Sequence, residues 1–73
     1  MLSSVFTEKM KILLKQRRQE LKLTQKQAAD RANIAESAYQ RYERGDTIPL
    51  AFMAVRIAKA LETTVEELYI DEE

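Results

Sequence analysis

The sequence contains no cysteine and no histidine, and only one glycine and one proline among its 73 residues. Without cysteine, neither a disulfide framework nor a cysteine-based metal site can form. Without histidine, the chain lacks the commonest acid–base residue and metal ligand, so its composition is unfavourable for an enzyme. Because glycine and proline are scarce while alanine, leucine, lysine, glutamate and glutamine are abundant, we expect helices joined by short connections.

Long apolar runs are also missing. No stretch is long enough to cross a membrane, and no charged-then-apolar leader with a cleavage site is present, so we expect the chain to stay in the cytoplasm. A length of 73 residues leaves room for one small domain, spanning 1–73, with a core near the lower limit for independent folding.

The net charge is zero, which by itself is unfavourable for a nucleic-acid-binding protein. The charges are unevenly distributed along the chain, however. Residues 1–44 carry ten Lys and Arg against five Asp and Glu, a balance of +5, and residues 45–73 carry two against seven, a balance of −5. A basic half can face phosphates while the acidic half faces away from them. The alternative is that both sets of charges simply solvate helix surfaces.

Apolar residues recur at three- and four-residue steps, which predicts amphipathic helices and an all-α fold. Five helices are expected, over about residues 4–21, 25–32, 36–44, 50–61 and 65–70. Before the fourth helix, Ile48 is expected to plug the core and Pro49 to stiffen the link. The residues of the fourth helix that we expect to be buried are Ala51, Ala54, Val55, Ile57, Ala58 and Leu61.

The stretch from Thr24 to Gly45 predicts two short helices joined by a tight turn. Thr24 and Gln27 form the pattern of a capping box at the start of the first helix. Asn33 tolerates the left-handed backbone that ends a helix abruptly, and Gly45 ends the second helix in the same way. One face of that second helix is polar throughout, an arrangement that fits the major groove of DNA. Its residues are Glu36, Ser37, Gln40, Arg41 and Arg44.

This helix-turn-helix and the motifs around it resemble the XRE/Cro family of phage and bacterial repressors. The flanking motifs are RQELKLTQ, which begins at Arg18, YERG at Tyr42–Gly45, Pro49, IAKAL at Ile57–Leu61 and VEELY at Val65–Tyr69. Any one of them alone is a weak signal, but together, in this order and spacing, they are specific. The resemblance covers about residues 10–69 and implies a five-helix, lambda-repressor-like DNA-binding domain.

The resemblance also implies roles for individual residues. Those expected at base edges are Glu36, Ser37, Gln40 and Arg41, with Arg41 suited to a bidentate contact with guanine. Those expected at phosphates are Arg18, Lys22, Thr24, Gln25, Lys26 and Arg44. Arg18 is expected to pair with Glu43 as well; the alternative is that this ion pair is purely architectural. No catalytic residue, cofactor or metal is expected.

Four positions depart from the family pattern. Asn33 replaces the usual turn glycine, and Ala35 stands where a Ser or Thr normally caps the recognition helix, which weakens that helix start by ~1 kcal/mol. Asp46 replaces a basic residue that faces a phosphate. Glu36 occupies the leading base-contact position, where it either accepts a hydrogen bond from cytosine or weakens binding. We therefore expect a modest affinity per subunit, so that dimerisation matters.

The leading hypothesis is a repressor-like, sequence-specific transcriptional regulator, bacterial or phage-encoded, that binds double-stranded DNA as a homodimer on a palindromic operator. The expected dimer surface comprises Leu68, Tyr69 and Ile70 with help from Val5 and Phe6, although these side chains could instead only close the core. One alternative is an antitoxin whose acidic half faces a basic toxin. Another is a protein-interaction module that has lost DNA binding. An enzyme is the least expected class, because the sequence shows no nucleophile–base pair, metal cluster or phosphate loop.

Overall fold

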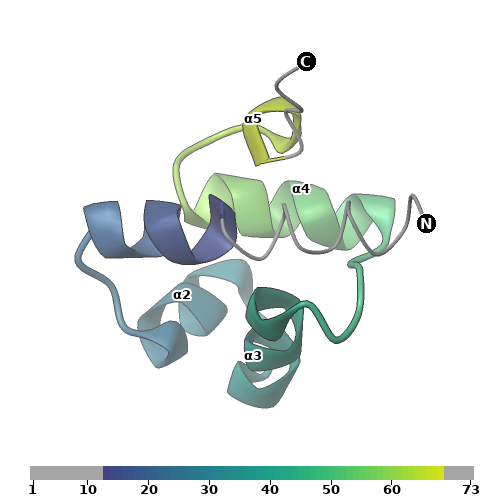
Figure 1. The fold of residues 1–73 in the computed structure, drawn as a ribbon, viewed down its shortest axis with the longest axis horizontal. Coiled ribbons are helices and arrows are strands. Elements are labelled where there is room, and N and C mark those ends of the chain that lie inside the picture. Colours follow the sequence, from purple (N-terminus) through teal and green to yellow (C-terminus); the bar gives the residue numbers. More distant parts are fainter. Residues whose placement is uncertain (1–12, 69–73) are drawn as a thin grey trace.

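The computed structural model describes residues 13–68, which form an all-α fold without a strand (Figure 1). A helical segment over residues 13–20 comes first. It is followed by α2 (Gln25–Ala32), α3 (Glu36–Arg44), α4 (Ala51–Ala60) and α5 (Val65–Leu68). The all-α, five-helix class expected from the sequence is confirmed. The bounds agree with the expected ones for α2 and α3, and α4 is one residue shorter at each end; the expected start of the first helix and end of the last lie outside the described residues.

The core lies around α4. In Figure 1, α2 and α3 lie on one side of α4 and α5 lies on the other. The largest fully buried side chains are Tyr39, Leu14, Ile57, Leu61 and Leu68. They come from the first helical segment, α3, α4 and its end, and α5. α2 contributes only alanines to the core, and their small side chains let α2 pack against both α3 and α4.

Leu68 therefore closes the core and does not lie on a free surface. This is the alternative that the sequence left open for a residue expected at a dimer surface. The other four residues of that expected surface, Val5, Phe6, Tyr69 and Ile70, lie outside the described residues.

Each of the four connections between helices contains one residue in the left-handed conformation, with φ of 59° at Lys22, 61° at Asn33, 84° at Gly45 and 59° at Glu62. After each of them, the next backbone N–H donates to the carbonyl five residues back, over 2.9 to 3.1 Å. This hydrogen bond is the mark of a Schellman ending, which satisfies a helix carbonyl that would otherwise lack a partner. The expectation for Asn33 and Gly45 is confirmed, whereas Lys22 and Glu62 were not foreseen.

Three residues that were expected in the core lie on the surface instead. Ile48 is 37% exposed and Val55 is 42% exposed, and Ala51 is exposed as well. The buried residues Ala54, Ile57, Ala58 and Leu61 lie along one side of α4 and its end. Val55 directly follows Ala54, and because successive helix residues are turned by about 100°, its side chain points away from that side. In the link before α4, Pro49 is buried in the place expected for Ile48.

Candidate nucleic-acid interface

Helix α3 presents two distinct faces. Its buried residues are Tyr39 and Glu43, four positions apart and hence one turn apart on the same side. Of the polar row expected on its other side, Glu36, Ser37, Arg41 and Arg44 are exposed and Gln40 is half-buried. At its start, Ala35 makes no side-chain capping hydrogen bond, as the lack of a hydroxyl requires.

The start of α2 is capped by the residues that the sequence indicated. Thr24 Oγ1 accepts a hydrogen bond from the Gln27 N–H at 3.0 Å, and Gln27 Oε1 accepts one from the Thr24 N–H at 2.9 Å. The Thr24 hydroxyl oxygen therefore caps the start of α2. Lys22 and Lys26 are exposed beside this start, and Lys26 lies 3.6 Å from Asp30 in an exposed ion pair.

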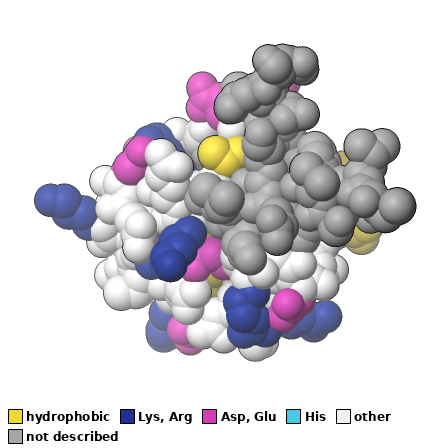
Figure 2. Space-filling model, in the orientation of Figure 1, with side chains coloured by type: hydrophobic (Ala, Val, Ile, Leu, Met, Phe, Trp, Pro, Cys, Tyr) yellow, Lys and Arg dark blue, Asp and Glu magenta, His cyan; other side chains and the backbone are white. Residues whose placement is uncertain are grey.

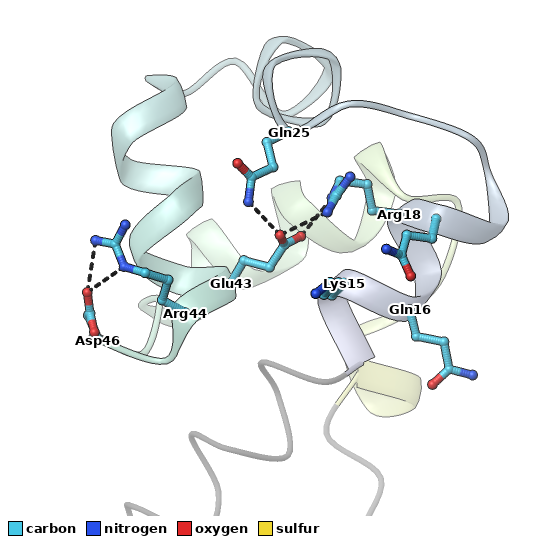
Figure 3. Close-up of a pocket in the computed structure, with 8 residues that line it drawn as sticks. Lys15, Gln16, Arg18, Gln25, Glu43, Arg44 and Asp46 are labelled. Atoms are coloured by element: carbon cyan, nitrogen blue, oxygen red, sulfur yellow. Dashed lines mark hydrogen bonds and ion pairs between the residues drawn. The ribbon is translucent and has the colours of Figure 1, made fainter.

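A buried carboxylate joins the first helical segment, α2 and α3 (Figure 3). Arg18 Nε and Nη2 donate to Glu43 Oε2 and Oε1 at 2.8 and 3.1 Å, and Arg18 Nη1 donates to the Leu23 carbonyl at 2.9 Å. Gln25 Nε2 and the Tyr39 hydroxyl donate to the same carboxylate at 2.7 and 2.9 Å. The side chains of Arg18 and Glu43 are only 13% and 5% exposed. The bidentate, largely buried ion pair and the Gln25 hydrogen bond therefore tie the three elements together.

The charge states in this cluster follow from its hydrogen bonds. Burial by itself would raise the pKa of Glu43, but the hydrogen bonds from Arg18, Gln25 and Tyr39 outweigh it and lower the pKa below the ordinary value of 4.5. Burial, together with the charge of Glu43, raises the pKa of Tyr39. At neutral pH the carboxylate therefore only accepts hydrogen bonds, and the protonated Tyr39 phenol donates to it.

Comparison with known proteins identifies the family of this chain. The chain matches the helix-turn-helix family over residues 14–68, which covers the described helices almost entirely. The chain belongs to the XRE/Cro-type helix-turn-helix family. It is 38% identical over 60 residues to the cryptic phage CTXphi transcriptional repressor RstR of Vibrio cholerae serotype O1, a match that covers 82% of this chain and 54% of that repressor. The chain thus spans about half the length of this curated relative. No solved structure matches the chain significantly.

In this XRE/Cro-type domain, a cleft opens between the first helical segment, the start of α2 and the end of α3 (Figure 3). Its lining residues are Lys15, Gln16, Arg18, Gln19, Gln25, Glu43, Arg44 and Asp46. The structure therefore brings together three of the residues expected at phosphates, Arg18, Gln25 and Arg44, whereas Lys22, Thr24 and Lys26 do not line the cleft. Sequence reasoning missed Lys15, Gln16 and Gln19; their signal was the polar side of the first helix that also carries Arg18.

Asp46 holds one of the expected phosphate ligands. Arg44 Nε and Nη2 both lie 2.9 Å from Asp46 Oδ2, and the two side chains are 59% and 53% exposed. The family usually has a basic residue at the position of Asp46. In this chain the Asp46 carboxylate pairs with the Arg44 guanidinium, which was expected to contact a phosphate.

Charges of both signs alternate across the surface that carries α2 and α3. In Figure 2, Lys and Arg side chains gather in the lower half of the molecule, and Asp and Glu side chains lie among them. On the face that Figure 2 shows, positive charge therefore comes from individual Lys and Arg side chains among acidic ones and not from one broad patch. In the described part of the chain, no group of three or more acidic side chains is arranged to hold a metal ion, and no helix is long and apolar enough to cross a membrane.

Proposed function

We propose that this domain is a sequence-specific DNA-binding transcriptional regulator whose helix α3 enters the major groove. The observation that carries the proposal is the division of α3 between an anchored side and an open side. Tyr39 and Glu43 fasten the helix to the core, while Glu36, Ser37 and Arg41 remain exposed. Membership of the XRE/Cro-type family and the similarity to a phage repressor support this proposal.

Base reading falls to the four expected residues. Arg41 is exposed near the middle of α3, and its planar fork suits the O6 and N7 atoms of guanine. Glu36 and Ser37 stand at the start of the helix, which is the end that contacts bases in this motif. Gln40 lies one turn beyond Glu36 and completes the set.

Phosphate binding falls to residues around the cleft and the start of α2. The backbone N–H groups of the first turn of α2 form a positive helix end, beside which Thr24, Gln25 and Lys26 are placed. Lys22 adds an exposed ammonium group there. Arg18 and Arg44, which also line the cleft, supply guanidinium groups, the first already shared with Glu43 and the second with Asp46.

A homodimer on a palindromic operator follows from the small size of the reading surface. Four side chains read about four base pairs, and such a site recurs far too often in a genome to be regulatory by itself. Two copies related by a two-fold axis, with half-sites about one helical turn of DNA apart, double the length of the site. Because each subunit contributes few Lys and Arg side chains without an acidic neighbour, two linked subunits should bind DNA much more tightly than one.

The test is selection from random double-stranded DNA at low salt, with the wild type, Arg41→Ala and the control Lys59→Ala, which removes an exposed charge from α4. The wild type is expected to enrich a palindrome. Arg41→Ala should relax one guanine position in each half-site by roughly 5- to 150-fold, the range of a good bidentate pair. Lys59→Ala should leave the preference unchanged. Absence of any enrichment by the wild type at low salt would refute the proposal and favour a protein-interaction module.

A further inference from the structure

The buried carboxylate of Glu43 dictates how the amide of Gln25 is oriented. An ionised carboxylate only accepts hydrogen bonds, so Gln25 must direct its nitrogen to it, and the Nε2–Oε1 distance is 2.7 Å. The opposite rotation of the Gln25 amide would bring two acceptor oxygens together. The carbonyl oxygen of Gln25 is consequently left as an acceptor for a second partner.

That second partner is Gln40, on the surface of α3. Gln40 Nε2 donates to Gln25 Oε1 at 3.3 Å and to Glu36 Oε2 at 3.5 Å. Both partners are acceptors, so both N–H groups of the Gln40 amide are directed toward the protein. Within residues 13–68, no hydrogen bond is formed to Gln40 Oε1. Glu43 thus fixes the orientation of the Gln25 amide, and Gln25 in turn fixes that of the Gln40 amide. The group of Gln40 that remains for another partner is its carbonyl oxygen, an acceptor.

We infer that this relay makes Gln40 an acceptor-only reader that selects cytosine at its position in the major groove. The inference rests on the proposed function, because it requires α3 to lie in the groove. A glutamine with both poles available pairs with adenine, donating to N7 and accepting from the N6 amino group. When its N–H groups are engaged by Gln25 and Glu36, the N7 contact is lost and adenine loses its advantage.

Cytosine matches the free acceptor of Gln40 best, because the donor that adenine offers, its N6 amino group, lies beside the N7 acceptor. The major-groove edge of cytosine offers the N4 amino group as a donor and no strong acceptor. Guanine and thymine present acceptor oxygens there, which Gln40 Oε1 would repel. Glu36 is an acceptor as well, so the leading edge of α3 presents two neighbouring acceptors to the DNA. Gln25 is a positioning residue in this scheme, because it acts on the base through Gln40.

The test compares selected sites for the wild type, Gln40→Ala, Gln25→Met and the double variant Gln25→Met/Gln40→Glu, with circular dichroism to establish that each is folded. The wild type should select cytosine at one position that Gln40→Ala relaxes. Gln25→Met keeps the length of the side chain but releases Gln40, so the ratio of adenine to cytosine at that position should rise at least about 10-fold. The double variant should return to cytosine, because a carboxylate accepts without needing a relay.

Lys26→Met is the matched control. Both Lys26→Met and Gln25→Met would remove a phosphate contact. The loss of such a contact lowers affinity for all sequences alike and leaves base preference unchanged. If Gln25→Met only lowers affinity and retains the wild-type preference, the relay is overturned, while a guanine position that depends on Arg41 would still support the proposed function. If no variant selects any sequence, both the relay and the proposed function are wrong.

Discussion

Replacing Glu43 by alanine should remove much of the stability of this domain. The carboxylate accepts hydrogen bonds from Arg18, Gln25 and Tyr39, and its side chain is only 5% exposed. Glu43→Ala would leave the Arg18 guanidinium, itself 13% exposed, without its counter-charge. Removing one partner of a buried ion pair costs about 3–5 kcal/mol. A chain of this length has a free energy of unfolding of roughly 4–11 kcal/mol in total, at about 0.05–0.15 kcal/mol per residue.

Urea denaturation followed by circular dichroism measures this loss. Asp46→Ala is the control, because the exposed Arg44–Asp46 pair should contribute no more than about 1 kcal/mol. The double variant Arg18→Met/Glu43→Leu should be more stable than Glu43→Ala, since it removes both charges and leaves none uncompensated. A loss below about 1 kcal/mol in Glu43→Ala would refute the argument that this carboxylate holds the helices together.

The same carboxylate makes stability depend on pH. Its pKa in the folded protein is lowered below the ordinary value of 4.5, so the folded state binds fewer protons than the unfolded state as pH falls. The stabilisation is therefore fully present above about pH 4.5 and is lost as pH falls through the folded pKa. The difference in free energy of unfolding between wild type and Glu43→Ala should shrink on acidification. A difference that grew below this pH would mean that the hydrogen bonds do not outweigh burial.

Two further substitutions test other features of the structure. Asp46→Asn should free the Arg44 guanidinium and raise DNA affinity several-fold, with a slope of log affinity against log salt that is steeper by about one, measured by fluorescence anisotropy; an unchanged slope would show that Arg44 does not reach a phosphate. Lys22→Gly relieves a positive φ at a non-glycine residue and should stabilise the fold by up to about 1 kcal/mol in urea denaturation while lowering affinity for all DNA sequences alike; a destabilised Lys22→Gly protein would contradict the first part.

The helix-turn-helix could be predicted from the sequence because its signals are local. The capping box of Thr24 and Gln27 and the endings at Asn33 and Gly45 each depend on residues within one turn, and the structure shows all of them. Lys22 and Glu62 adopt the same left-handed conformation without a residue type that favours it. There the left-handed conformation accompanies the Schellman hydrogen bonds and the packing of Leu23 and Leu61 against the core, which a local pattern does not show.

Burial at the edges of α4 was predicted less well, for a related reason. Hydrophobicity alone placed Ile48 and Val55 in the core, although a domain of this size has too little interior to bury every apolar side chain. The structure gives that space to Pro49 and to the stripe through Ile57 and Leu61. The periodicity of α4 already turns Val55 away from this stripe, whereas the exposure of Ile48 depends on how the link before α4 packs, which a local pattern does not contain.

The hydrogen-bond network of the candidate site shows most clearly what a linear pattern lacks. The family resemblance paired Arg18 with Glu43, but it did not indicate that Gln25 also reaches this carboxylate or that Gln40 meets Gln25. Those contacts join residues 15 and 18 positions apart, so they exist only once α2 and α3 have packed. Because the carboxylate cannot donate, the orientation of both amides then follows from its charge. In the proposed relay, Glu43 would serve not only stability but also the choice of hydrogen-bonding group that α3 offers to DNA. Stability and base preference should then change together when Glu43 or its protonation changes.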